Sequence, residues 1–410
     1  MTSRHPWPLV AAGTTLIAVC YGFARFAYGL TEPDISADLE VSGSVSGLVA
    51  SGSYVGYCVA IVVSSVLTPV WGARRTATTA GGVATAGMVM VATSPNAAVL
   101  AVGVLVAGAS TGAASPPLAA AISRWIVQPH RDRSQTIVNA GTGLGVVVSG
   151  PIALAAGESW RAAWTVFAVA AFGATVWIWC ALRADGEGDG DRAAAGRSSA
   201  TRGVHGLRQV VPPVVPGAGR LLLVATVMGA VSVATWTFGR RLVQSAGGMD
   251  PTGSAVLWIV LGAAGMLGAV GGDLGGKVGP ARLWRALMLA LSAATATLAL
   301  RATGVAAYVA ATVFGASYIA LTGLVLVSAS RLWPDHVGAG VGAGFLAIAM
   351  GQAVCVPFLG LAADVVALPV VFGGTAVVGA AASVIRLPVV EDRDENAHAR
   401  SRLAQGVVRS

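Results

Sequence analysis

Long apolar stretches without a single charged side chain alternate along the chain with short clusters of charged residues. A helix that crosses a bilayer needs about 20 apolar residues, so most of these stretches predict one membrane-spanning helix each. Thr76–Ser123 is 48 residues long and contains the turn sequence Thr93–Asn96, so it predicts two. The pattern therefore predicts twelve spanning helices, of which Ala286–Leu300 gives the shortest. The eleven uncharged runs are Pro8–Ala24, Val41–Ala73, Thr76–Ser123, Ser134–Gly157, Ala162–Leu182, Leu221–Gly239, Pro251–Gly272, Ala286–Leu300, Ala302–Ser330, His336–Ala363 and Val365–Ile385.

The composition is that of a membrane protein. Charged residues make up 11% of the 410 residues and hydrophobic ones 55%, with a mean hydropathy of +0.74, whereas soluble domains carry about 25% charged residues. These values exclude a soluble enzyme, a nucleic-acid-binding domain and a disordered chain. The four cysteines fall in predicted spans without the spacing of a disulfide framework or a metal site. No cofactor motif occurs, so we expect neither a metal nor a cofactor.

The basic residues lie mostly on one side of the predicted membrane. When the segments between spans are assigned alternately to two sides, 21 of the 26 lysines and arginines fall on the side that holds both termini. Lysine and arginine gather on the cytoplasmic side of membrane proteins, so both termini are predicted to be cytoplasmic. The first segment on the other side carries Glu32, Asp34, Asp38 and Glu40 and no basic residue, which fits. The net charge of +8 thus reflects topology and does not indicate a nucleic-acid partner.

The predicted spans fall into two halves of six. Residues 1–183 form the first half and residues 220–389 the second; the polar, glycine-rich stretch 184–219 predicts a cytoplasmic linker, and residues 390–410 a cytoplasmic tail. A nearly constant offset between landmarks of the two halves predicts a duplicated six-helix unit. The landmarks are Gly72 with Gly279 and Arg124 with Arg331, each pair 207 residues apart, and Pro151 with Pro357, 206 apart.

The segments after the second and eighth spans carry a loop motif. The pattern G-x-L-x-D-R-x-G-R-R is matched in part, and the residues that carry it are Gly72, Arg74 and Arg75 in the first half and Gly272, Lys277, Gly279 and Arg282 in the second. The motif Asp is replaced by Pro69 and Gly276. On these residues the chain resembles the major facilitator superfamily. The segment Gly22–Tyr28 is similar to the first helix of a poorly characterised bacterial branch of it, the YbfB-type transporters.

The resemblance implies an all-helical membrane protein in which two six-helix bundles give alternating access to a cavity lined by helices one, four, seven and ten. It also implies a monomer within the lipid bilayer of a bacterial plasma (inner) membrane. The fifth span resembles the family's antiporter motif, although packing of small residues around a proline kink explains the same pattern equally well. Pro357 is the equivalent kink of the second half, and the residues of the fifth-span pattern are Gly141, Gly145, Gly150 and Pro151.

Arg25 is the one charge expected inside a span. A helix from about Ala11 to about Asp34 would hold it a little beyond the middle, where an arginine costs about 2.5–3.5 kcal/mol to insert. Either its guanidinium lines the translocation cavity and binds an anionic group, which we favour, or it is structural and reaches the membrane interface or the carbonyls of a neighbouring helix. Three polar residues share its face of a helix, and these are Tyr21, Tyr28 and Glu32.

Further polar residues within predicted spans either bind substrate or serve packing between helices. Arg240 and Arg241 end the seventh span on the outer side. There they either anchor the helix at the interface, which we favour, or guard the outer mouth and pair with Glu32 and Asp34. The further candidates within spans are Tyr54, Tyr57, Asn139, Thr235, Trp236, Tyr318 and Gln352.

These features predict a secondary active or facilitative transporter of a small organic, anionic solute, by symport, exchange or facilitated diffusion, with or without coupling to protons. One alternative is efflux of drugs or metabolites by proton antiport. It loses support because no acidic residue or histidine falls at mid-depth, and because Gly108 stands where the family's drug antiporters carry a basic residue ahead of Gly112. A receptor or scaffold in the membrane is a further alternative. An intramembrane enzyme would need a nucleophile and base or a metal site within the spans, and none is predicted.

Overall fold

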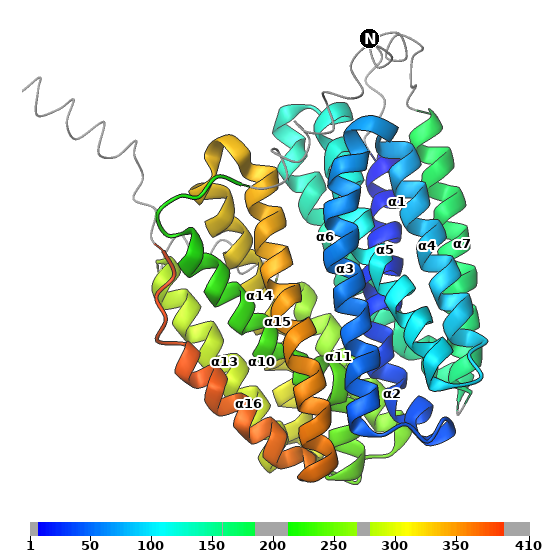
Figure 1. The fold of residues 1–410 in the computed structure, drawn as a ribbon, viewed down its shortest axis with the longest axis vertical. Coiled ribbons are helices and arrows are strands. Elements are labelled where there is room, and N and C mark those ends of the chain that lie inside the picture. The colour runs from blue at the N-terminus through cyan, green and yellow to red at the C-terminus, as the bar shows by residue number, and fades with distance from the viewer. Residues whose placement is uncertain (1–6, 158, 185–211, 269–278, 389–410) are drawn as a thin grey trace, which may run out of the picture.

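The structure, a computed structural model, describes residues 7–157, 159–184, 212–268 and 279–388, and every regular element within these ranges is a helix (Figure 1). Most of the predicted linker, the predicted tail, Gly272 and Lys277 lie outside the described residues. The first half contains α1 (Trp7–Ile17), η1 (Ala18–Phe26), α2 (Ala27–Asp38), α3 (Gly43–Trp71), α4 (Ala73–Ala92), α5 (Ala97–Trp125), α6 (Gln128–Ala156) and α7 (Trp160–Ala184). The second contains α10 (Ala218–Ser245), α11 (Pro251–Gly268), α13 (Pro280–Leu300), α14 (Gly304–Leu332), the short η3 (Pro334–His336), α15 (Val337–Val365) and α16 (Leu368–Ala382).

The predicted number of twelve helices is confirmed in the described part of the chain, with α1, η1 and α2 counted as one continuous first helix and the short η3 left aside. Nine of the described helices are long and apolar enough to cross a membrane, including the span over Ala286–Leu300 that was predicted to be shortest. That span starts earlier than predicted, at Pro280, so Arg282 and Arg285 lie in its first turns. The first helix and α10 are the most deeply buried of the nine, so they form the centre of the molecule.

The two halves lie side by side, the first coloured blue to green and the second green to red in Figure 1. They meet where α3 packs along α15, α6 against α11, and α2 against α10. We call the end of the molecule that holds Trp7, Trp71 and Leu332 the proximal end, and the opposite end, which holds Asp38 and Val365, the distal end.

Gly72 and Gly279 mark the same turn in both halves. Gly72 separates α3 from α4 with φ 83° and ψ 155°, and Gly279 precedes α13 with φ 86° and ψ 140°. A side chain is strained at such positive φ, so both turns require glycine. Two residues 207 apart thus share one unusual backbone conformation, which agrees with a duplicated unit.

The first helix is not the straight α-helix that the sequence suggested. Over Ala18–Phe26 it is a π-helix, a wider form that is rare and often found at functional sites. Its backbone receives support from outside, because Thr111 Oγ1 of α5 donates to the carbonyl of Cys20 at 2.7 Å. Arg25 lies in this segment, so the wide turn alters which side chains share its face.

Glycines bring η1 and α6 into backbone contact. A Cβ on Gly22 would lie 2.3 Å from Cα of Gly145, and a Cβ on Gly145 would lie 2.1 Å from the carbonyl oxygen of Ala18. Gly141 likewise faces the carbonyl of Thr14. The glycines of the fifth span therefore serve close packing against the first helix, while Gly150, Pro151 and Pro357 lie within uninterrupted helices.

We predict that Gly145→Ala lowers the melting temperature of the purified protein, because overpacking costs about 1–3 kcal/mol. Gly173→Ala in α7 is the matched control, since a Cβ there meets no atom within 4 Å and alanine favours helix. Equal melting temperatures for the two variants would contradict the packing described.

Candidate functional site

A cavity of about 700 Å³ lies between the two halves. It extends from mid-depth, where Arg25 and Tyr318 lie, towards the proximal end, because its other residues come from the proximal parts of their helices. Helices one and ten line it, as the family resemblance implied, but helices five, eight and eleven (α6, α11 and α15) take the places expected for four and seven. Its lining is Ile17, Tyr21, Arg25, Phe26, Thr136, Asn139, Ala140, Thr142, Gly143, Gly265, Met266, Tyr318, Ile319, Ala320, Thr322, Gly323, Leu326, Val327, Phe345 and Ile348.

Arg25 takes part in a polar chain that joins the two halves at the inner end of this cavity. Its Nη2 donates to Oε1 of Gln352, which is fully buried. The amide of Gln352 in turn donates from Nε2 to the hydroxyl of Tyr318 at 3.4 Å. Arg25 belongs to the first half, and Gln352 on α15 and Tyr318 on α14 belong to the second. The structure thus unites three candidates that lie up to 327 residues apart.

Aromatic rings surround the guanidinium of Arg25. Its Cζ lies 5.3 Å from the ring centroid of Phe26, 5.0 Å from that of Tyr54 and 4.7 Å from that of Tyr57. Such contacts stabilise a desolvated cation by about 2 kcal/mol. They hold Arg25 in place while its side chain is only 7% exposed.

The charge of Arg25 is not neutralised by a carboxylate within the described part of the chain. Every ion pair found there joins other residues, and the hydrogen-bond partner of Arg25 is a neutral amide. Its Nε is buried and has no hydrogen-bond partner. A buried cation without an anion is costly, so this site is suited to an anionic ligand.

The other predicted residues of the central region surround this group. The Tyr21 hydroxyl shares a hydrogen bond of 2.8 Å with Ser115 Oγ. Trp236 packs its ring on Phe26, with centroids 4.2 Å apart, and near Tyr318, 5.3 Å away. Thr235 and Tyr57 are buried, each with an unpartnered hydroxyl. Asn139 lies nearer the cavity mouth, where its Oδ1 accepts from Gln135 at 3.3 Å.

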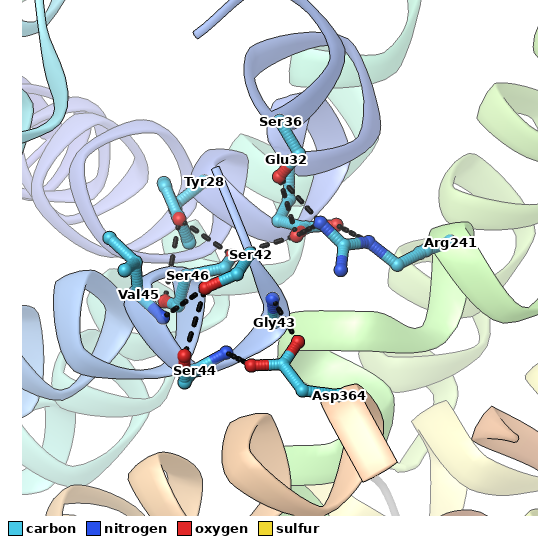
Figure 2. Close-up of polar contacts among 10 residues, drawn as sticks. All are labelled: Tyr28, Glu32, Ser36, Ser42, Gly43, Ser44, Val45, Ser46, Arg241 and Asp364. Carbon is cyan, nitrogen blue, oxygen red and sulfur yellow. Dashed lines mark hydrogen bonds and ion pairs between the residues drawn. The ribbon is translucent and has the colours of Figure 1, made fainter. Parts of the chain in front are cut away.

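Tyr28 and Glu32 do not line the cavity; they lie on α2 towards the distal end and belong to the cluster of polar contacts in Figure 2. Glu32 is completely buried, and its carboxylate is 2.5 Å from Nη2 of Arg241 and accepts from Nε of Arg241 at 3.1 Å. Ser36 and Ser46 donate to the same carboxylate at 3.0 and 2.7 Å. Tyr28 supports Ser46 through a hydroxyl contact of 2.9 Å. Arg241 is on α10, so this ion pair joins the halves.

Two more contacts join the halves at the same end. Nη1 of Arg240 on α10 lies 2.6 Å from Oδ2 of Asp34 and donates to the carbonyl of Leu30 at 2.5 Å. The carboxylate of Asp364 on α15 accepts from the backbone N–H of Gly43 at 2.7 Å and of Ser44 at 2.9 Å (Figure 2). Backbone N–H groups at a helix start bind anions well, so Asp364 caps α3 across the interface.

We name the three contacts together the distal closure: Glu32 with Arg241, Asp34 with Arg240, and Asp364 with the start of α3. The sequence analysis favoured an interfacial anchor for Arg240 and Arg241. The structure instead shows the alternative, in which both arginines pair with Glu32 and Asp34. Asp364 had not been singled out, although it is the single charge between the last two uncharged runs. Glycines permit this approach, since a Cβ on Gly360 would lie 2.3 Å from the carbonyl oxygen of Gly43.

The loop-motif residues that the structure describes lie at the proximal end. The guanidinium of Arg74 stacks over Trp179, with Cζ 3.4 Å from the ring centroid, while Arg75 and Arg282 are exposed. The described residues contain no group of three or more His, Cys, Asp or Glu side chains that could hold a metal ion.

Within the described residues, twelve helices in two halves surround a central cavity, an architecture typical of membrane transport proteins. The sequence matches the family model of the Major Facilitator Superfamily over residues 14–354, so the chain belongs to that superfamily. No curated protein matches the chain in sequence.

Three solved structures show the likeness in fold. The nucleoside transporter NupG has 11% identity and a TM-score of 0.72, over 92% of this chain and 96% of that one. The inward-open xylose transporter XylE from E. coli has 12% identity and a TM-score of 0.72, over 95% and 98%. A mutant of the peptide transporter POT in complex with sulfate has 15% identity and a TM-score of 0.71, over 94% and 95%.

We predict that Glu32→Gln opens the distal end in part of the molecules, because removing one member of a buried ion pair costs about 3–5 kcal/mol. Asp364→Asn is expected to act in the same direction but more weakly, because Asp364 is exposed and a charge at a helix start contributes about 0.3–1 kcal/mol. Spin labels on cysteines at the exposed Ala37 and Ala367, in a background without the native cysteines, report the separation of the halves by electron–electron resonance. A longer distance is expected to appear.

Asp38→Asn is the matched control, because it removes the same charge from an ion pair with Arg161 that stays within the first half. Its distance distribution is expected to stay that of the parent protein. An unchanged distribution in Glu32→Gln and Asp364→Asn as well would show that these contacts do not hold the distal end closed.

Proposed function

We propose that the protein carries a small organic anion across the plasma membrane of a bacterium by alternating access, with Arg25 holding the anionic group. The observation that carries this proposal is the buried guanidinium at the inner end of the cavity, which has no carboxylate partner within the described residues. A transported anion supplies the missing charge. The proposal includes no catalytic step.

The surroundings of Arg25 favour an anion over a cation. Of the residues that line the cavity, Arg25 is the one that carries a charge. A cationic solute would meet this positive field without an acid to offset it. Efflux of cationic drugs by proton antiport therefore gains no support from the cavity, while exchange, symport and facilitated diffusion of an anion all remain compatible with it.

The charge distribution supports an orientation with the proximal end in the cytoplasm, since 21 of the 26 basic residues fall on the side of the termini. In that orientation the cavity faces inward and the distal closure seals the outside. The outward-facing state then requires the ion pairs of Arg240 and Arg241 to separate. The ion pairs of the distal closure thus stabilise the inward-facing state, in which each of these charges has a partner of opposite charge.

We predict that Arg25→Ala abolishes uptake of organic anions into proteoliposomes. The panel of radiolabelled anions, of which the parent protein must take up at least one, consists of acetate, benzoate, succinate and citrate, with xylose and uridine as neutral solutes. A hydrogen bond to a charged group contributes about 1.5–3 kcal/mol, so loss of the guanidinium lowers affinity about tenfold to more than a hundredfold. Arg25→Lys is expected to keep part of the activity, because it keeps the charge and loses the fork of donors.

Arg161→Ala provides the control, since it removes an arginine that pairs with Asp38 at the distal surface. Each variant must be purified in equal amount and melt cooperatively. Transport of a neutral solute that survives Arg25→Ala at the parent rate would contradict the proposed function.

A further inference from the structure

We infer that the transported ligand is an organic monoanion with one carboxylate and an apolar body, and that its carboxylate takes the place of Gln352 on Arg25. This inference rests on the proposed function and narrows it to a substrate class. Four observations carry it: the number of charges in the cavity, its lining near Arg25, the free edge of the guanidinium, and the position of Gln352 on the opposite half.

The cavity provides one positive charge. Arg25 is its single charged lining residue, and the two arginines of α10 at the interface, Arg240 and Arg241, are paired with acids in the distal closure. A second carboxylate on the ligand would therefore be desolvated without a cation to receive it. Burial of an unpaired charge is strongly unfavourable, so the site accepts a monoanion and rejects a dianion.

Most of the cavity wall beyond Arg25 is apolar, although Tyr21 and Tyr318 beside it carry hydroxyl groups. Phe26 follows Arg25 on the first helix, Ile319 follows Tyr318 on α14, and Ile348 lies one helical turn from Gln352 on α15 towards the cavity mouth. Ile17 and Phe345 extend this surface in the same direction. A volume of about 700 Å³ is within the range of sites that enclose small organic ligands, about 300–1,000 Å³. A ligand whose carboxylate reaches Arg25 thus places its body against hydrocarbon.

One edge of the guanidinium is only half used. Nε and Nη2 of an arginine point the same way and together form a fork that matches the two oxygens of a carboxylate. In this protein Nη2 donates to Gln352, while Nε has no partner. A carboxylate would engage both N–H groups and add the opposite charge. The amide of Gln352 offers one oxygen and no charge, so the ligand displaces it.

This displacement links binding to movement of the halves. Arg25 is on the first half and Gln352 on the second, so their hydrogen bond joins the two at mid-depth. A ligand that takes over Arg25 removes this bond and leaves Gln352 with Tyr318 of its own half. The ligand thereby weakens one contact that opposes the rocking motion.

Binding to the purified full-length protein in detergent tests the substrate class. Calorimetric titrations compare hexanoate and benzoate with three matched sets: their neutral amides hexanamide and benzamide, the dianions adipate and terephthalate, and acetate, which lacks an apolar body. We expect hexanoate or benzoate to bind at least about tenfold more tightly than each matched compound, because one charged contact or several buried methylenes separates them.

Two variants test the displacement. Gln352→Glu is nearly isosteric and places a carboxylate on Arg25 from within, so it is expected to abolish binding of hexanoate and benzoate. Gln352→Ala frees the edge of Arg25 and is expected to keep binding or strengthen it. Unchanged monoanion binding in Gln352→Glu would overturn the inference.

The outcomes separate the inference from the proposed function. If adipate, terephthalate or acetate binds as tightly as the larger monoanions, and Arg25→Ala abolishes that binding, the substrate class is wrong and an anion transporter remains. If the amides bind as well as the acids, and binding survives Arg25→Ala, both are wrong.

Discussion

The structure depends on one guanidinium in the middle of the first helix, held by aromatic rings and a single amide. Arg25 is buried at the inner end of the cavity, and Phe26, Tyr54 and Tyr57 lie around it. Cation–π contacts offset part of the cost of desolvation, but they do not supply a negative charge. The π-helical segment that carries Arg25 has a rare backbone geometry that is frequent at functional sites. We propose that an anionic ligand completes this arrangement.

The two ends of the interface differ in how their charges are satisfied. At the distal end, Glu32, Asp34 and Asp364 each meet a donor from the other half, so the closure is complete. At mid-depth, Arg25 meets the other half through the neutral amide of Gln352. In the cycle that we propose, the closure stabilises one state, and a ligand replaces the central contact, which pairs Arg25 with a neutral group. Alternating access requires contacts of different strength at the two levels, because the halves could not rock if every contact between them were too stable to break.

Much of the fold could be predicted from the sequence because charged residues are rare and therefore informative. The uncharged runs predicted the spanning helices. The positive φ angles of Gly72 and Gly279 agree with the duplicated unit that their spacing along the sequence predicted. Arg25 was recognised because a charge inside an apolar run has few explanations. The same logic applied to Asp364 would have pointed to the end of α15, where it caps α3.

The partnerships within the site could not be predicted. Gln352 and Arg25 are 327 residues apart, and the sequence holds no local signal that joins them. Tyr28 and Glu32 were expected on the helix face of Arg25, with Glu32 about 10 Å further along the axis. The structure places both in α2, where they contact Ser46 and Glu32 pairs with Arg241. Such contacts depend on how the two halves pack against each other. The hydrophobic period of a single helix carries no information about that packing.

The central claim is that the anion missing from Arg25 is the ligand itself. The most direct measurement is an experimental structure of the protein with 4-bromobenzoate, in which the anomalous signal of bromine locates the molecule. The account predicts the carboxylate on Nε and Nη2 of Arg25, the bromine among the apolar walls near Ile319 and Phe345, and the amide of Gln352 turned away from Arg25. Bromine outside the cavity, with Gln352 still bound to Arg25, would contradict it.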